Sequence, residues 1–192
     1  MAIQINGDGT ITGISVGGLP DGIVDTDMLA AGAATQAKRT PATGEIIQVV
    51  TKNITNELEL TSTSSSYADM TNHNLAITPT SATSLLYFNL TLAGTKLYDT
   101  SGSDHRAYFG LTDDGASSYL QETEFRMYEY GGGYHLGLYH KSPMVISHIK
   151  TAGSTSARTY ALRWKLLQGE GLVVNETSTN EVSTMTITEI KA

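Results

Sequence analysis

The stretch Ser156-Ala-Arg-Thr-Tyr-Ala-Leu-Arg-Trp-Lys-Leu-Leu-Gln168 decides the fold, because its residues alternate in character with a period of two. One side holds Tyr160, Leu162, Trp164 and Leu166, and the other holds Thr159, Ala161, Arg163 and Lys165. This pattern is typical of an antiparallel strand with one face in a core and the other in water. Trp164 is the only tryptophan, so we expect it at the centre of the core. Residues 181–191 alternate in the same way and predict a second such strand.

The composition favours strands and an assembled protein. Of 192 residues, 40% are apolar and 16% are charged. The charged share lies below the usual value of about 25%, and Thr, Ser and Gly, which suit strands and turns, take its place. So little charge protects a free monomer poorly against association, which indicates a chain that works inside a larger assembly.

Charge and cysteine content exclude several classes of function. The net charge is −7 and no cluster of Lys and Arg occurs, which disfavours nucleic-acid binding. The absence of cysteine excludes disulfides, thiolate zinc sites and a cysteine nucleophile. No run reaches the roughly 18 apolar residues of a membrane span, so we expect no membrane insertion. The first residues do not have the pattern of a secretory signal, so we expect none.

Residues 1–43 differ from the rest, because they contain no aromatic residue. Asn6-Gly-Asp-Gly9 predicts a hairpin between strands in residues 1–5 and 10–15. Residues 24–38 predict a short helix that is Ala-rich and marginal alone. Such a segment cannot build a core, so it is either disordered or held by another chain. The residues that we expect to make the contact are Ile3, Ile5, Ile11, Ile14, Leu19, Met28 and Leu29.

After a linker at residues 40–44, strands and turns alternate to the end of the sequence. The expected strands are residues 45–54, 56–63, 67–72, 75–78, 84–97, 106–112, 119–130, 134–140, 144–150, 156–168, 172–175 and 181–191. The inward face of the 84–97 strand is ambiguous from the sequence. We predict two domains, residues 1–43 and 44–192, and an all-β antiparallel sandwich of the jelly-roll type in the second.

Two regions of the chain resemble a kind of bacteriophage virion protein. The first contains Ile5-Asn-Gly-Asp-Gly-Thr-Ile-Thr-Gly-Ile14, Gly17-Gly-Leu-Pro-Asp-Gly22 and Asp27-Met-Leu-Ala-Ala31, and is similar to the leader of phage tail-fibre and appendage proteins. The second contains Glu45-Ile-Ile-Gln-Val-Val50, Thr61-Ser-Thr-Ser-Ser-Ser-Tyr67, Leu75-Ala-Ile-Thr-Pro-Thr80 and Ser183-Thr-Met-Thr-Ile-Thr-Glu-Ile190. These motifs resemble small jelly-roll modules that trimerise in the manner of tumour-necrosis-factor domains. Ser84-Leu-Leu-Tyr-Phe88 departs from the more aliphatic strand of the usual module.

The resemblance implies a non-enzymatic structural protein of the virion, assembled in the host cytoplasm. It would be a homotrimeric short tail fibre or appendage. Residues 1–43 would attach it to another virion protein, such as a tail adaptor, a nozzle or the capsid. The jelly roll would project outward and contact either a host-surface glycan or protein, or another protein of the particle. One alternative is a capsid decoration or spike protein, and a less favoured one is a glycan-degrading tailspike.

The polar residues do not form a recognisable catalytic or metal-binding motif, so we expect neither catalysis nor a cofactor. His135 and His140 are an odd number of residues apart and would point to opposite faces of a regular strand. A threefold axis could still gather three copies of one histidine. Asp113 and Asp114 lie beside Gly115, where aspartate is an ordinary turn former. Glu122 and Glu124 share one strand face, which we expect to be solvated.

An aromatic cluster is the best candidate for binding. It flanks Gly131-Gly-Gly133 and comprises Tyr128, Tyr130, Tyr134, His135, Tyr139 and His140. Tyrosine offers a flat apolar face with a polar end, which suits stacking on a sugar or burial in a protein interface. The alternative is that these tyrosines line the core or a trimer axis.

Overall fold

The computed structural model describes residues 4–5, 11–12, 40–99, 104–113, 118–128, 138–169, 171–176 and 180–192. The chain divides into two compact units, Met1–Pro41 and Ala42–Ala192. In the first unit, β1 (Gln4–Ile5) pairs antiparallel with β2 (Ile11–Thr12), as the Asn-Gly and Asp-Gly signals predict. The expected helix at 24–38 lies outside the described residues. The domain boundary expected after residue 43 stays a prediction.

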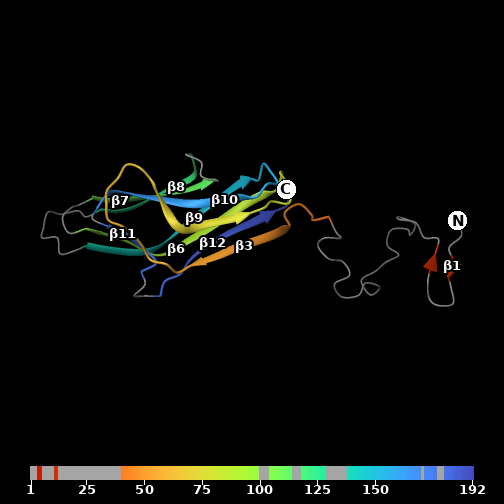
Figure 1. Ribbon diagram of the computed structural model, residues 1–192, viewed down its shortest axis with the longest axis horizontal. Helices are drawn as coiled ribbons and strands as arrows, with labels where there is room; N and C mark the ends of the chain where they lie inside the picture. Colours follow the sequence, from red (N-terminus) through yellow and green to blue (C-terminus); the bar gives the residue numbers. More distant parts are fainter. Residues whose placement is uncertain are drawn as a thin grey trace. The chain divides into compact units, whose positions relative to one another are not determined.

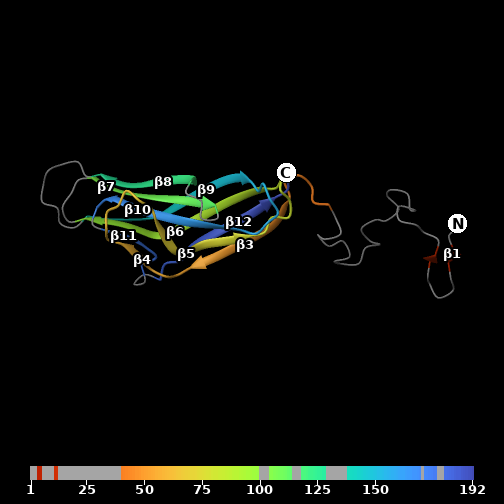
Figure 2. The same ribbon diagram turned by 45° about the horizontal axis from the view of Figure 1, so that its top comes forward.

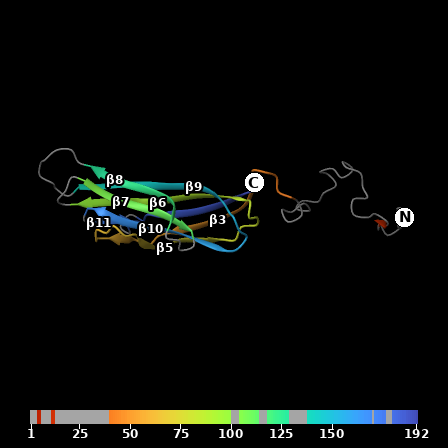
Figure 3. The ribbon, with the colours of Figure 1, turned by 90° about the horizontal axis from the view of Figure 1, so that it is seen from above.

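The second unit consists of two antiparallel sheets packed against each other (Figure 1). The four-stranded sheet has the order β5-β10-β7-β8, and Figure 3 looks onto it. Its strands are β5 (Ala68–Ile77), β7 (Asp104–Asp113), β8 (Tyr119–Tyr128) and β10 (Arg158–Gln168). The larger sheet contains β3 (Ile46–Ile54), β4 (Leu58–Leu60), β6 (Leu85–Asp99), β9 (Leu138–Thr151), β11 (Gly171–Val174) and β12 (Ser183–Ile190). The sequence prediction of an all-β sandwich is confirmed at this level.

The main strand pairs are nested, like successive segments of one long hairpin. From the outside inward, the pairs are β3 with β12, β5 with β10, β6 with β9, and β7 with β8. The first and third pairs lie in the larger sheet, and the second and fourth lie in the four-stranded sheet. The chain therefore crosses from one sheet to the other between successive pairs.

The long strand β6 organises the larger sheet. Leu85–Thr91 of β6 pairs with both β12 and β9, so these two strands lie at opposite edges of β6. Further along, residues 96–98 pair with both β11 and β9. Strands β12 and β11 therefore follow one another along the same edge of β6, and β3 and β4 lie outside them (Figure 2).

The core lies between the sheets, and the strand that holds Trp164 is oriented as expected. Tyr160, Leu162, Trp164 and Leu166 are all buried, with Trp164 only 4% exposed. The rings of Phe88 on β6 and Tyr160 on β10 meet edge to face across the two sheets, with centroids 4.7 Å apart. On β6 the structure selects one inward set, which consists of Leu86, Phe88, Leu90 and Leu92.

Two breaks that the sequence predicts are bulges inside continuous strands. Residues 138–140, the described part of the expected strand 134–140, join the expected strand 144–150 in β9, in which Pro143 lies opposite Ala93 and Gly94 of β6. Proline is tolerated at a bulge because a ladder hydrogen bond is already missing there. The expected strands 67–72 and 75–78 join in β5, where Asn72 takes a left-handed backbone angle, φ 65°. Separate strands were therefore the wrong prediction at both places.

The C-terminal residues return to the start of the sandwich (Figure 1). The N–H of Lys191 donates to the carbonyl of Glu45 at 2.9 Å, and the N–H of Gly44 donates to the carbonyl of Lys191 at 2.7 Å. In the part of the chain that the structure describes, no helix is long and apolar enough to cross a membrane.

Candidate functional site

The outer face of the larger sheet lacks charge over the area where β3, β12, β6 and β9 lie side by side. Side chains on these strands alternate between buried and exposed, so every second residue faces outward. The register aligns the outward residues in four rows. The rows are Ile46-Ile190-Leu85-Thr151, Val49-Thr188-Tyr87-Ile149, Thr51-Thr186-Asn89-Ser147 and Asn53-Thr184-Thr91-Val145. We name these sixteen positions the uncharged face, because none of them is Asp, Glu, Lys or Arg.

Large aliphatic side chains on the uncharged face are open to water. Ile46 is 56% exposed, Val49 55%, Val145 58% and Ile149 57%. With strands about 4.8 Å apart and a rise of about 3.4 Å per residue, the face covers on the order of 450 Å² in projection. Soluble monomers rarely expose apolar patches larger than a few hundred Å², and such patches mark interaction sites. Nine of the sixteen positions are Thr, Ser or Asn, so the apolar part is only a fraction of this area. The exposed aliphatic side chains and the lack of charge give the uncharged face the chemistry of a protein–protein contact.

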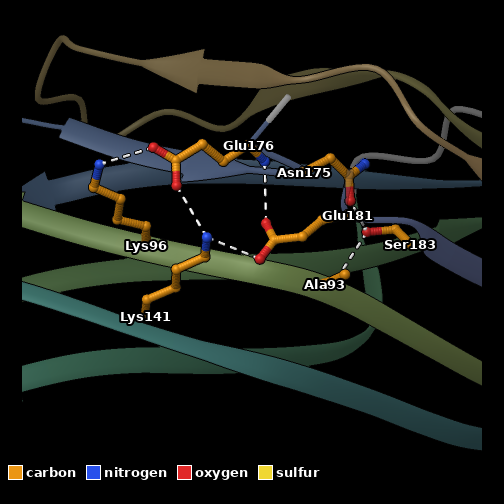
Figure 4. Close-up of polar contacts among 7 residues, drawn as sticks. All are labelled: Ala93, Lys96, Lys141, Asn175, Glu176, Glu181 and Ser183. Atoms are coloured by element: carbon orange, nitrogen blue, oxygen red, sulfur yellow. Dashed lines mark hydrogen bonds and ion pairs between the residues drawn. The ribbon is translucent and has the colours of Figure 1, made fainter. Parts of the chain in front are cut away.

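A network of ion pairs lies on the same sheet beyond the uncharged face (Figure 4). Lys141 on β9 contacts Glu176 at 2.9 Å and Glu181 at 2.8 Å, and Lys96 on β6 contacts Glu176 at 3.3 Å. Hydrogen bonds with the two glutamates raise the pKa of Lys141, and those with Lys141 and Lys96 lower the pKa of Glu176. The carboxylate of Glu181 lies so close to Gly94 that a side chain at position 94 would collide with it. The network ties the residues between β11 and β12 to β6 and β9.

Two buried polar side chains extend this connection into the core (Figure 4). Asn175 has a left-handed backbone, φ 57°, and its Nδ2 donates to the carbonyl oxygens of Ile54 and Asn56 at 3.2 Å each. The hydroxyl of Ser183 donates to Oδ1 of Asn175 at 2.5 Å and accepts from the N–H of Ala93 at 3.0 Å. Side chains at the end of β11 and the start of β12 therefore satisfy backbone groups at and just after the end of β3 and within β6.

The outer face of the four-stranded sheet has the opposite character, since tyrosines and charges cover it. Lys165 lies 4.4 Å from the ring centroid of Tyr67 and 4.8 Å from that of Tyr108. The Tyr67 hydroxyl donates to Glu122 at 2.7 Å, and the Tyr108 hydroxyl donates to Glu124 at 3.0 Å. Burial and then the Glu122 hydrogen bond raise the pKa of Tyr67, and the Glu124 hydrogen bond raises that of Tyr108. Both hydroxyls are therefore protonated donors at neutral pH.

Tyr119 completes this group, which we name the tyrosine face (Tyr67, Tyr108, Tyr119 and Lys165). The centroids of the Tyr67 and Tyr119 rings are 4.4 Å apart. The Tyr119 ring lies directly on Gly110, where a Cβ atom would approach ring carbon Cδ1 to 2.3 Å. Position 110 therefore requires glycine, because the Tyr119 ring occupies the space of a side chain. Glu122, the register partner of Gly110, and Glu124 are both exposed, as the sequence predicts.

A polar hollow adjoins the tyrosine face. It has a volume of about 520 Å³, and its lining includes Asp69, Asn72, Asn74, Thr112 and Arg163. Arg163 Nε donates to Oδ1 of Asp69 at 2.7 Å, and its Nη2 donates to the Tyr67 carbonyl at 3.3 Å. Thr112 is the register partner of Tyr119, which brings the hollow next to the tyrosine pair.

The binding residues expected from the sequence are not tested by the structure. Tyr130, Tyr134 and His135 lie outside the described residues, and so do the side chains of Tyr128, Tyr139 and His140. In the first unit, Ile3, Ile14, Leu19, Met28 and Leu29 lie outside as well, and only the backbones of Ile5 and Ile11 are described, as register partners in the hairpin.

Sequence reasoning missed both surfaces that the structure presents. On β9, Met144 and Ile146 alternate with Val145 and Ile149, so both sides of the strand look apolar and the sequence does not show which side faces out. On β7, Tyr108 lies between Ala107 and Phe109. This alternation places Tyr108 on the outer face only if Ala107 and Phe109 are already known to be buried. Among the described residues, no three His, Asp or Glu side chains are grouped to hold a metal ion.

Comparison with known proteins does not assign the chain. No protein-family model matches it, and no curated protein matches it in sequence.

Proposed function

We propose that this chain is a structural protein of a bacteriophage particle, a short homotrimeric tail fibre or appendage without catalytic activity. The uncharged face is the observation that carries the proposal. Four aliphatic side chains more than half exposed, on an uncharged area of one sheet, would favour aggregation of a free monomer. Contact with other copies of the chain would bury these side chains.

The contrast between the two outer faces supports this orientation. Charged and aromatic groups lie on the tyrosine face and around it, including Arg163, Glu122 and Glu124. Cores of protein interfaces are depleted of charged residues, while charged surfaces stay in water. We therefore place the uncharged face at the contact between copies and the tyrosine face on the outside of the assembly.

The strand connectivity supports a jelly roll. The strands lie in the order β3-β12-β6-β9 in the larger sheet and β5-β10-β7-β8 in the four-stranded sheet. These orders arise when one long nested hairpin is rolled into two sheets, as in a jelly roll. Threefold association rests on the resemblance to trimerising modules, and the uncharged face of the larger sheet is compatible with it.

Attachment to the particle is assigned to residues 1–43. The first unit contains a two-stranded hairpin, and a hairpin alone is marginally stable in water. Three such arms joined by one trimer would bind with a high effective concentration, so weak single contacts could hold firmly. The docking partner in this proposal is another virion protein, and the projecting sandwich contacts the host surface.

The direct test is to locate the protein on the particle. Phage particles that carry a C-terminal epitope on this chain are labelled with gold and imaged by electron microscopy. Label at the tail supports the proposal, and label over the capsid surface favours the alternative of a decoration or spike protein. Particles without label would contradict a structural role in the virion.

A further inference from the structure

The polar hollow beside the tyrosine face exists because β5 contains a wide bulge. Four residues of β5 separate the register pairs Asp69–Arg163 and Asn74–Ala161, where β10 has only Leu162. Asn72 lies at this bulge in the left-handed region, φ 65°, which is uncommon for a residue other than glycine. Bulges and such backbone angles are frequent next to binding sites, where they redirect side chains.

The lining presents several polar side-chain groups within one hollow. It combines the Asp69 carboxylate, the amides of Asn72 and Asn74, the Thr112 hydroxyl and the Arg163 guanidinium. The Asp69 side chain is 84% exposed although it pairs with Arg163, and Thr112 Oγ1 donates to the Ala161 carbonyl at 3.2 Å. Asn74 Oδ1 accepts from Lys52 Nζ at 3.0 Å, so the ligand would meet chiefly the Asp69 carboxylate, the Asn72 amide, the Asn74 NH2 group and the Arg163 guanidinium. These groups include both acceptors and donors, which suits a ligand whose groups both donate and accept.

A pair of tyrosine rings lies near these groups on the same sheet. Tyr67 precedes Asp69 by two residues, and the Tyr67 ring packs against that of Tyr119. Tyr119 is fixed on Gly110, which is the register partner of Arg163. Tyrosine rings offer apolar faces to the C–H side of a sugar ring, while the polar groups next to them reach its hydroxyls.

We infer that this hollow binds a hydroxyl-rich saccharide that carries no phosphate. The inference rests on the proposed function, in which the outer face of the assembly contacts the host surface. The hollow volume of about 520 Å³ lies within the range of small-ligand sites.

The charge around the hollow selects against other ligands. Arg163, which lines the hollow, is already paired with Asp69, and Lys165 lies over the rings of Tyr67 and Tyr108; with a net charge of −7 on the chain, binding of a phosphorylated ligand is disfavoured. A peptide bound through apolar anchors would need apolar pockets, whereas the side chains that rim this hollow are mostly polar. A ligand that binds through hydroxyl groups carries no phosphate charge and needs no apolar pocket.

The test uses the labelled full-length protein on a printed array of bacterial surface oligosaccharides, with and without phosphate substituents. Two variants remove lining groups without disturbing the backbone. Asp69→Asn removes the charge at an exposed site, and Asn72→Gly suits the left-handed angle. Asn180→Gly is the matched control, because Asn180 is also exposed and left-handed, φ 52°, but lies just before β12.

We expect phosphate-free oligosaccharides to be retained by the wild type. Each lining variant should weaken binding by roughly threefold to tenfold, and the control should not change it. Absence of binding to every oligosaccharide, or binding that both lining variants keep in full, would overturn the inference. Binding restricted to phosphorylated sugars would overturn it as well. The oligomeric state of each sample, measured in parallel, shows separately whether the proposed trimer is intact.

Discussion

The buried carboxylate of Glu189 on β12 accepts a hydrogen bond of 2.9 Å from the backbone N–H of Thr80, 109 residues earlier in the chain. The Thr80 hydroxyl donates to the same oxygen at 2.9 Å, and Gln48 Nε2 donates to the other oxygen at 2.6 Å. Glu189 therefore joins the last strand to β3 and to the connection between the two sheets.

Replacing Glu189 by Gln should destabilise the sandwich. Burial raises the pKa of Glu189, but the hydrogen bonds from Gln48 and Thr80 outweigh burial and lower it overall. The amide of Gln offers one acceptor in place of two, and its NH2 group would face donors. We expect a loss of about 1–3 kcal/mol in the free energy of unfolding. Chemical denaturation checks this loss, with the exposed Glu124→Gln as a control that changes little.

The same carboxylate should contribute to acid denaturation. Because the folded pKa of Glu189 lies below its ordinary value of 4.5, its contribution is fully present above pH 4.5. It is lost as the pH falls through the folded pKa. The stability difference between wild type and Glu189→Gln should therefore shrink below pH 4.5, and a difference that stays constant down to the acid limit would contradict this assignment.

Replacing Trp164 by Ala should remove a large part of the stability. The side chain is 4% exposed, and its ring centroid lies 6.4 Å from that of Phe109 on the neighbouring strand. Truncation of a buried Trp costs about 3–5 kcal/mol, against a typical stability of about 5–15 kcal/mol. Thermal unfolding measures the loss, and an unchanged midpoint would place Trp164 outside the core.

His73 should make the fold sensitive to mild acid. Burial is the main cause that lowers its pKa, the charge of Lys52 lowers it further, and the hydrogen bond with the Thr71 carbonyl opposes this. Below pH 6.5, the unfolded chain binds a proton at His73 that the folded chain resists, so stability falls as the pH drops towards the folded pKa. The melting temperature of His73→Leu should fall less between about pH 7.5 and 5.5 than that of the wild type. Equal falls would refute the assignment.

Residues 1–43 should be dispensable for folding but required for incorporation into particles. All of the described core lies in the second unit, from Ile54 to Ile187. A chain that starts at Gly44 should keep the melting temperature and the oligomeric state of the full chain, and be absent from purified particles. The truncated protein is supplied by the host to a phage that lacks the gene, and mass spectrometry of the purified particles measures its incorporation. Normal incorporation would mean that the attachment site lies on the sandwich.

The sequence predicts the sandwich because its decisive strands have one apolar and one polar side. In β10 the inward set from Tyr160 to Leu166 is unambiguous. The prediction is weaker where both sides of a strand are apolar, as at Val145 and Ile146, because only packing against the second sheet decides which side is buried. The bulges at Pro143 and Asn72 look like strand breaks, since proline and polar residues at a bulge resemble those of a turn.

The hollow could not be predicted from the sequence for a related reason. Asp69, Thr112 and Arg163 come from three strands, and only the register places them together. The tyrosine cluster around Gly131-Gly-Gly133 is apparent from the sequence because its members are close together in the chain. Tyr67, Tyr108 and Tyr119 are distant in the sequence and meet only in the fold.

Native mass spectrometry of the full-length protein tests the central claim most directly, by comparing the wild type with Val145→Lys and Ala76→Lys. Val145 is 58% exposed on the uncharged face, whereas Ala76 is exposed on β5 of the other sheet. Burying an unpaired lysine ammonium in an interface carries a large desolvation cost. We predict the mass of three chains for the wild type and Ala76→Lys, and the mass of one chain for Val145→Lys. A monomeric wild type, or a Val145→Lys variant that stays trimeric, would contradict assembly through the uncharged face.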